Sequence, residues 1–448
     1  MNDQNKTVGT DAVYDARSLG SGKMFVLGFQ HMFAMFGATV LVPAITGLSV
    51  SATLLFAGLG TLLFHFLAKG KVPAFLGSSF AFLGGYAAIA PRLADGAANP
   101  LLPYACFGVA CAGLLYVIMA ALFKSFGVKK VMRFFPPIVT GPIIISIGLT
   151  LSSSAISNIA ACWWVALIAI ITVIVCNIWG HGMIKIIPIL MGVILSYAVA
   201  AVAGQVDFTP VRDADWVGLP FQWGDTVFGL LSSDALDSEL LLTAVITIVP
   251  IALATIVEHI GDMCAISSTC ERNYLEDPGL HRTLLGDGLA TALAALFGAP
   301  ANTTYGENTG VLALSRVYDP KVVRIAAFLA SLFSFSPKFA ALITCMPTAT
   351  IGGVSLVLYG MISAVGVRNV VENQVDFTKS RNVIIAALIL VLAIGINYGP
   401  GSITIGSVSL SGLATAAIVG IALNAALPGK DYEFGSDHQG STSVNFKV

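Results

Sequence analysis

Acidic and histidine side chains interrupt the most apolar parts of this chain. Glu258, His259 and Asp262 lie within one long apolar run. Glu307 lies in a segment rich in glycine and asparagine, and His31 lies in the first apolar run. Ionisable groups at bilayer depth are costly, so where they occur they usually line a binding site or an ion pathway. The pattern therefore predicts a membrane transporter.

The four-residue spacing of Glu258 and Asp262 places both carboxylates on one face of a helix. Two carboxylates buried this close together repel when both are ionised, so at least one of them could hold a proton near neutral pH. Proton coupling requires this chemistry. The alternative is a structural cluster in which His259 and a helix carbonyl satisfy the two acids. No metal-ligand set and no nucleophile–base pair accompanies them in the sequence, which argues against an intramembrane enzyme.

The composition is that of a polytopic membrane protein. Of the 448 residues, 56% are hydrophobic and 10% are charged, whereas soluble domains carry roughly 25% charged residues. The net charge of −1 argues against nucleic acid as a partner. The polar ends, residues 1–23 and 428–448, are too short to bury a core of their own. The expected surroundings are therefore the lipid bilayer.

Apolar runs of the length that crosses a bilayer, about 20 residues, predict fourteen spans in two groups of seven. The first seven lie near 24–43, 50–68, 73–91, 101–123, 134–155, 159–180 and 183–203. The second seven lie near 240–270, 282–299, 301–318, 321–336, 339–365, 382–398 and 405–427.

The basic residues predict the orientation of these spans. If the N-terminus is cytoplasmic and the runs alternate, only Arg92, Arg212 and Lys338 of the 23 Lys and Arg residues lie outside. This bias fits the positive-inside rule and predicts a multi-pass protein of the cytoplasmic membrane with both termini in the cytoplasm. The predicted parts are an N-terminal tail (1–23), a first repeat (24–203), an extracytoplasmic loop (204–239), a second repeat (240–427) and a C-terminal tail (428–448).

Two of the runs are poor helices. The third contains Leu76-Gly77-Ser78-Ser79-Phe80, and the tenth opens with Pro300 and continues to Asn308. Glycine, serine and asparagine favour broken or extended backbone, which is tolerated at membrane depth only where protein or a cavity satisfies it. Each break is in the third run of its group of seven. Interrupted segments at matching positions of two halves indicate the binding site of a transporter.

The two halves also share a weak echo, since Gln30-His31 in the first corresponds to Glu258-His259 in the second. Seven is an odd number of spans, so the second half must enter the membrane from the opposite side. The sequence therefore predicts two inverted repeats.

The breaks predict the chemistry of the cavity between them. Gly306 allows close approach of the backbone to a ligand, and the half-helix that follows points free N–H groups toward the cavity. Ser79 and Phe80 offer the same in the third run. The candidate aromatic faces are Phe80, Tyr305 and Tyr359. Backbone donors, carboxylate acceptors and aromatic faces suit a flat, neutral heterocycle with alternating carbonyl and N–H groups. Anionic substrates fit worse, because no Arg or Lys lies deep in these runs.

Three stretches carry a resemblance to a known family. They are QHMFAMFGATVLVP at Gln30–Pro43, GKVPAFLGSSFAF at Gly70–Phe82, and DPGLHRTLLGDGLAT with NTTYGENTG at Asp277–Thr291 and Asn302–Gly310. The family signature begins here with Glu307-Asn308-Thr309-Gly310 and ends with Ser315-Arg316, where serine keeps the hydroxyl of the usual threonine. From Phe25 to Leu427 the chain resembles the nucleobase–ascorbate transporters, and within them the bacterial uracil permeases.

The resemblance implies an all-α membrane protein of fourteen spans in two inverted seven-span repeats. Short strands in spans three and ten pair at the centre, a core domain holds the site, and a gate domain forms a homodimer. It implies proton symport of a nucleobase without a cofactor or metal. The implied substrate contacts are Phe80, Glu258, Tyr305, Gly306, Glu307 and Tyr359. The expected proton-coupling residues are Glu258, Asp262 and Glu307, and the expected supporting residues are Gln30, His31, Ser79, His259 and Asn308.

One departure leaves the substrate open. Some uracil-type relatives have histidine where this chain has Asp262, and aspartate is commoner in purine-type relatives. Tyr305-Gly306-Glu307 favours pyrimidines, since xanthine carriers more often have glutamine at the position of Glu307. We therefore expect a proton-coupled uracil importer, with a xanthine or broad-specificity nucleobase symporter as the alternative. An anion exchanger or channel on the same architecture would need a basic cavity, which this sequence lacks.

Overall fold

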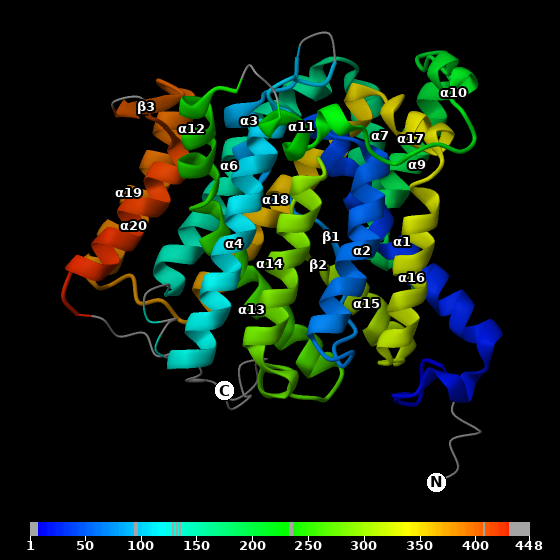
Figure 1. Ribbon diagram of the computed structural model, residues 1–448, viewed down its shortest axis with the longest axis horizontal. Helices are drawn as coiled ribbons and strands as arrows, with labels where there is room; N and C mark the ends of the chain where they lie inside the picture. The colour runs from blue at the N-terminus through cyan, green and yellow to red at the C-terminus, as the bar shows by residue number, and fades with distance from the viewer. Residues whose placement is uncertain are drawn as a thin grey trace.

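The chain folds into an array of long helices with two short strands near its middle (Figure 1). The computed structural model describes residues 8–93, 97–127, 130, 133, 136–232, 236–405 and 408–429. The two central strands are β1 (Leu76–Ser78) and β2 (Asn302–Thr304), and they pair antiparallel. The short strands expected in the third and tenth runs are therefore confirmed.

The helices before the middle of the chain are η2 (Ala16–Leu19), α1 (Ser21–Thr46), α2 (Val50–Leu67), α3 (Leu83–Ile89), α4 (Leu102–Phe126), α6 (Pro137–Ala160), α7 (Trp163–Trp179), α8 (Met183–Ile186) and α9 (Pro188–Val202). The connecting loop contains α10 (Thr209–Asp213), η3 (Trp223–Asp225) and α11 (Val227–Leu231). The later helices are α12 (Ser238–Ile248), α13 (Ile251–Thr269), η4 (Leu275–Gly279), α14 (Leu280–Leu296), α15 (Gly306–Ser315), α16 (Pro320–Phe333), α17 (Pro337–Thr344), α18 (Thr348–Glu372), α19 (Ser380–Tyr398) and α20 (Gly412–Ala426).

Within the described residues, seven helical segments are long and apolar enough to cross a membrane. They are α1, α2, α4, α6, α12 together with α13, α18 and α19. Helices α16 and α17, which are bent by 88° at their junction, would form an eighth. Helices α7, α9 and α20 are apolar but shorter. The chain is therefore a mostly helical polytopic protein with seven to eight candidate spans.

Prolines divide two of the predicted runs. Pro250 separates α12 from α13 within the run at 240–270. Pro347 separates α17 from α18 within the run at 339–365. Proline lacks the N–H that a helix interior needs. The prediction of one helix over 339–365 is therefore wrong, and α17 instead forms the bent pair with α16.

The last predicted run is also only partly helical. The segment before α20 forms a hairpin of β3 (Ser402–Ile405) and β4 (Val408–Ser411), paired antiparallel. The helix of this run thus begins at Gly412, where the hydroxyl of Ser411 accepts from the N–H of Ala414 and caps it.

The outer edges of the central strands are satisfied by two threonines. Thr61 of α2 accepts a hydrogen bond from the N–H of Leu76 at 2.9 Å, and its hydroxyl lies 3.2 Å from the carbonyl oxygen of the same residue. Thr291 of α14 accepts from the N–H of Asn302 at 3.2 Å and donates to its carbonyl at 2.9 Å. Unpaired backbone groups are costly at membrane depth. One hydroxyl on each side therefore replaces the neighbouring strand of a larger sheet.

Glycines allow this close approach. The amide of Asn302 donates to the carbonyl of Phe56 at 3.0 Å, and a Cβ at Gly60 would lie 2.3 Å from that amide nitrogen. On the other strand, a Cβ at Gly77 would lie 2.4 Å from the ring of Tyr305. Both contacts are far inside van der Waals distance, so only glycine fits at these two positions.

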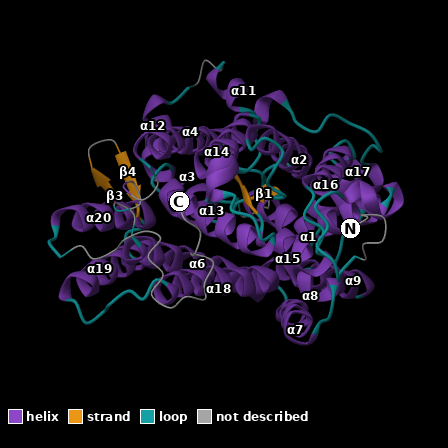
Figure 2. Cartoon of the chain, turned by 90° about the horizontal axis from the view of Figure 1, so that it is seen from below, coloured by secondary structure: helices purple, strands orange, loops and turns teal. Residues whose placement is uncertain are grey.

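The helices separate into neighbourhoods. Seen from below, the strands lie among α1, α2, α13 and α14, while α6 and α18 run side by side along another part of the molecule (Figure 2). Glycines bring α6 and α18 together, since a Cβ at Gly148 would lie 2.2 Å from the carbonyl oxygen of Tyr359. Small residues at helix contacts are typical of membrane proteins.

The described N-terminal residues pack along the end of α15 and the start of α16. The N–H of Val13 donates to the carbonyl of Arg316 at 2.9 Å, and the N–H of Tyr318 donates to the carbonyl of Val13 at 2.8 Å. The carboxylate of Asp319 accepts from the N–H of Ala16 at 2.9 Å. Residues near the start of the chain are thus tied to a segment some three hundred positions later.

An ion pair joins the turns on the same side of the molecule. Lys71, in the turn between α2 and β1, donates a hydrogen bond to Asp277, in the turn before α14. The Lys71 hydrogen bond lowers the pKa of the exposed Asp277 carboxyl. This contact links the approach to β1 with the helix that supports β2.

We predict that Thr61→Val and Thr291→Val each destabilise the protein. Valine keeps the volume but leaves a buried strand N–H and C=O without their partner, which costs about 1–3 kcal/mol. Thermal unfolding of the purified protein in detergent, together with transport, measures this loss.

Thr172→Val is the matched control, because the Thr172 hydroxyl bonds only to Ile168 of its own helix, at 2.7 Å. Equal melting temperatures for all three variants would contradict the role given to the two strand-edge threonines.

Candidate functional site

Helix α13 lies within the helical array (Figures 1 and 2) and carries Glu258 and Asp262 four residues apart, on one face. Glu258 and Asp262 are half-buried, while Gly261 and Ala265 on the same face are exposed. A Cβ at Gly261 would meet no atom within 4 Å. Two carboxylates at this depth are stable only beside polar groups or water. The described residues therefore leave this face of α13 uncovered at Gly261 and Ala265.

Asp262 connects this face to the central strands. The hydroxyl of Thr304, the last residue of β2, donates to the Asp262 carboxylate at 2.6 Å. The distance is typical of a charge-assisted hydrogen bond. Asp262 is thus fixed against the strand.

Glu307 and Gly306 open α15 directly after β2. Gly306 is exposed, and a Cβ there would meet no atom within 4 Å. The first N–H groups of a helix have no partner within it and carry partial positive charge. Helix α15 contacts α13, the helix that carries Glu258 and Asp262. The start of α15 therefore offers donors beside a cluster of acceptors.

His31 and Asn308 form a buried pair between α1 and α15. The Asn308 amide lies 3.1 Å from His31 Nδ1 and donates to the His31 carbonyl at 2.9 Å. Because an amide N–H₂ group only donates, Nδ1 of His31 accepts and carries no proton. The pair fixes the first turn of α15 against α1. Gln30, the neighbour of His31, is half-buried.

Tyr305 acts as a brace. Its side chain is 4% exposed, and its hydroxyl donates to the carbonyl of Ser78 at 3.0 Å. The Tyr305 N–H donates to the carbonyl of Phe75 at 3.0 Å. The ring lies against Gly77, so it locks the two strands together.

The residues after β1 mirror those after β2. The N–H of Ser79 donates to the carbonyl of Ala301 at 2.8 Å, which extends the strand pairing by one bond. Phe80 is half-buried and packs against the main hydrophobic cluster. The two breaks thus meet at the paired strands, with Phe80 following β1 and Gly306 following β2.

Tyr359 lies in a different neighbourhood. It is 1% exposed on α18, and its hydroxyl is near Ser154 of α6 and Ser355. Among the described residues, no hydrogen bond or ion pair joins Tyr359 to the acids of α13 and α15. The other predicted site residues come together around the strands, and Tyr359 packs at the contact of α6 with α18.

The sequence reasoning missed Asp287. This carboxylate on α14 is fully buried, and its Oδ2 lies 3.0 Å from Nδ1 of His259, which is also fully buried. Nε2 of His259 lies 3.1 Å from the hydroxyl of Thr283. The signal was present, since Asp287 is an acid inside an apolar run flanked by Gly286 and Gly288.

Comparisons with known proteins agree with one another on the family. A family model named Xan_ur_permease and described as "Permease family" matches residues 22–402. The uracil permease of Bacillus caldolyticus is 41% identical over 420 residues, which cover 91% of this chain and 93% of the relative. The uracil permease of Escherichia coli (strain K12) is 37% identical over 416 residues, covering 89% and 90%.

Solved structures share the fold at low identity. The transmembrane domain of the cyanobacterial bicarbonate transporter BicA matches with a TM-score of 0.57 and 15% identity, over 92% of this chain and 99% of that one. A structure of SLC26A9 matches with a TM-score of 0.63 and 11% identity, over 92% and 66%. These likenesses concern the fold alone. The family match covers most of the chain, and so the chain belongs to the nucleobase–ascorbate transporter family of membrane permeases.

Proposed function

We propose that this chain is a proton-coupled transporter that imports uracil across the cytoplasmic membrane by alternating access. The observation that carries the proposal is the contact of α13, which carries Glu258 and Asp262, with helix α15, which begins just after the paired strands. Relatives at 37–41% identity that are named uracil permeases support the substrate.

In the proposed complex, the carboxylates of Glu258 and Glu307 accept hydrogen bonds from the ring N–H groups of uracil. The backbone N–H at Gly306 bonds a ring carbonyl, because no side chain obstructs that position. Phe80 covers one face of the ring. Tyr305 holds the two strands that position these groups. Tyr359 of α18 is the remaining proposed substrate contact.

Proton coupling is assigned to Glu258, Asp262 and Glu307. The three carboxylates cannot all ionise without strong mutual repulsion. Proton binding relieves that repulsion, so movement of a proton and movement of uracil become linked. The process needs no cofactor and no metal.

His259 and Asp287 extend this arrangement. The Thr283 hydroxyl donates to the carbonyl of Leu280 at 3.1 Å, so it accepts from Nε2 of His259. Nδ1 then faces the Asp287 carboxylate at 3.0 Å. Two lone pairs at that distance would repel, so a proton lies between them, on either the ring or the acid. We infer that the pair formed by His259 and Asp287 holds one proton next to Glu258.

The proposed architecture is two inverted repeats of seven spans, at 24–203 and 240–427. Its support is internal: β1 pairs with β2, and Thr61 satisfies one strand edge as Thr291 satisfies the other. A core domain around the strands would move against a gate domain that contains α6 and α18. The homodimer through the gate and the cytoplasmic position of both termini belong to the same proposal.

The presence of aspartate at position 262 is also compatible with a second class of substrate, the purines. Purine-type relatives more often carry aspartate here, so a xanthine or broad-specificity nucleobase symporter is the second candidate. Asp262 already accepts from Thr304, which leaves it less available to a substrate than Glu258.

Uptake into proteoliposomes tests the function. Labelled uracil should accumulate when the outside is acidic relative to the lumen, and a proton ionophore should abolish accumulation. Competition by unlabelled xanthine separates the two substrates. Xanthine competing as well as uracil at equal concentration would overturn the pyrimidine assignment.

We predict that Glu258→Gln abolishes uracil accumulation and that Glu307→Gln weakens uracil binding by about 10- to 100-fold. The second figure corresponds to the loss of one charge-assisted hydrogen bond. Binding to the purified protein and uptake together separate the two effects. Glu239→Gln, an exposed site at the start of α12, is the control, and normal uptake in both site variants would remove the assignment.

For Asp262→Asn we predict uptake with a changed pH profile. The amide keeps an acceptor for Thr304 but no longer binds a proton. Initial uptake rates measured across the acid-to-neutral range check this. A profile identical to that of the unaltered protein would give Asp262 a purely structural role.

The His259–Asp287 pair generates a separate prediction. In Asp287→Asn, the side-chain amide can donate to Nδ1 of a neutral His259, so melting should be nearly unchanged while proton movement per uracil changes. Asp287→Ala leaves buried polar groups unpaired and should cost about 1–3 kcal/mol of stability. An unchanged proton-to-uracil ratio in Asp287→Asn would refute proton storage by the pair.

A further inference from the structure

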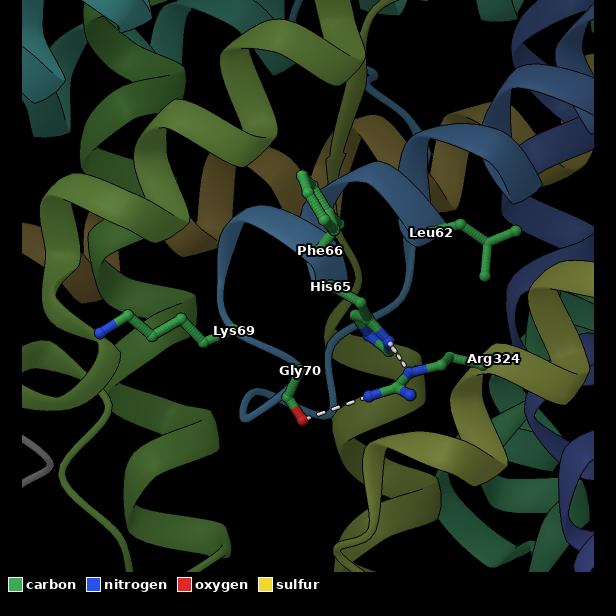
Figure 3. Close-up of a pocket in the computed structure, with 6 residues that line it drawn as sticks. All are labelled: Leu62, His65, Phe66, Lys69, Gly70 and Arg324. Carbon is green, nitrogen blue, oxygen red and sulfur yellow. Dashed lines mark hydrogen bonds between the residues drawn. The ribbon is translucent and has the colours of Figure 1, made fainter.

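A cavity separate from the acidic site lies between the ends of α2 and α16. It has a volume of about 470 Å³ and is lined by Leu62, His65, Phe66, Lys69, Gly70 and Arg324 (Figure 3). It opens on the side of the molecule where Lys71 meets Asp277. Neither Lys69 nor Arg324 takes part in the transport scheme proposed above.

The Arg324 guanidinium is held in place by the turn that follows α2. Its Nε donates to Nδ1 of His65 at 3.3 Å, and its Nη2 donates to the carbonyl of Gly70 at 3.3 Å (Figure 3). His65 is 2% exposed, and its Nε2 lies 2.8 Å from the carbonyl of Ala74. Since Nδ1 accepts from an arginine, Nε2 donates to that carbonyl and the ring is neutral. These neutral groups therefore hold the Arg324 guanidinium in a fixed orientation without neutralising its positive charge.

The cavity is rich in uncompensated positive charge. In the part of the chain that the structure describes, no carboxylate lies within ion-pair distance of Arg324 or Lys69. A cation that is fixed but lacks an acidic partner favours an anionic ligand. Lys69 extends away from the guanidinium (Figure 3), so it belongs to the rim of the cavity and Arg324 to its floor.

Exposed apolar side chains lead away from this cation along both helices. Phe66 of α2 is 80% exposed, and Leu59, seven residues earlier on the same face, is 38% exposed. On α16, Phe328 is 64% exposed and Leu332 is 59% exposed, at four-residue steps from Arg324. Residues at these spacings share a helix face. The exposed apolar residues of α2 and of α16 thus form two stripes that both end near the Arg324 guanidinium. Such an arrangement suits a lipid, whose tails are apolar and whose headgroup is charged.

We propose that this cavity binds an anionic phospholipid. The phosphate contacts Arg324, Lys69 adds charge at the rim, and the acyl chains lie along the stripes that contain Phe66 and Phe328. A basic pocket between membrane helices is a known form of lipid headgroup site. A soluble phosphate would use the cation but not the apolar stripes, which is why the lipid is the favoured occupant.

The position of the cavity connects it to the central strands. The turn that holds Arg324 runs from Lys69 through Ala74 directly into β1. A lipid phosphate on Arg324 would add a partner to this turn and restrict its movement. We therefore expect the lipid to stabilise the protein and to favour strand pairing.

The test measures lipid retention and melting in the full-length protein. Purified protein is prepared in phosphatidylcholine with and without phosphatidylglycerol, and bound phosphatidylglycerol is counted by native mass spectrometry. Arg324→Gln should reduce phosphatidylglycerol retention about tenfold or more, as expected when a charge-assisted contact is lost. The rise in melting temperature caused by phosphatidylglycerol should disappear with it.

Lys124→Gln is the matched control, since it removes an equal charge from the exposed end of α4. Phe66→Ala is a second test that does not disturb packing, because Phe66 is largely exposed. It should lower retention without changing the melting temperature in phosphatidylcholine alone. Full retention in both Arg324→Gln and Phe66→Ala would overturn the proposal. Stabilisation by inorganic phosphate alone, equal to that by the lipid, would overturn the lipid in favour of a free anion.

Discussion

The constraint that governs this structure is the need to pair the backbone groups where two apolar runs form short strands instead of helix. β1 and β2 satisfy each other on their inner edges, and Thr61 and Thr291 satisfy the outer ones. Without these bonds, the break would be too costly at membrane depth. With them, extended backbone can stand in the middle of a helical protein, and helix α15 can begin there rather than at the surface.

The acidic cluster depends on this arrangement. Since α15 begins just after β2, and both elements contact α13, Glu307 and the free N–H groups of the first turn lie close to the acidic face of α13. Thr304 ties Asp262 to the strand, and Asn308 ties the first turn of α15 to His31. Strand, helix start and carboxylates thus form one unit, and a disturbance in any part would reach the others.

The sequence alone predicted the features that are energetically costly in a membrane protein. Acids at bilayer depth and glycine-rich breaks are rare, so Glu258 and the segment before Glu307 stood out. Thr61 did not, because a threonine that also bonds to its own helix, here at Ala57, looks ordinary in a sequence. Asp287 met the same criterion as Glu258 and was overlooked. Tyr359 was one of the candidate aromatic faces, and only the resemblance made it a substrate contact; its burial against α6 depends on tertiary packing that no local pattern encodes.

The pairing of β1 with β2 sets an order of events during synthesis. Chains emerge from the ribosome N-terminal end first, and the partner of Leu76 is Thr304, which is made much later. The inner edge of β1 therefore lacks its partner while the segment between the two strands is made and inserted. The centre of the protein cannot be completed before β2 is made, so a ribosome that stops before the tenth run leaves a membrane-inserted fragment with an open strand edge, a target for quality-control proteases.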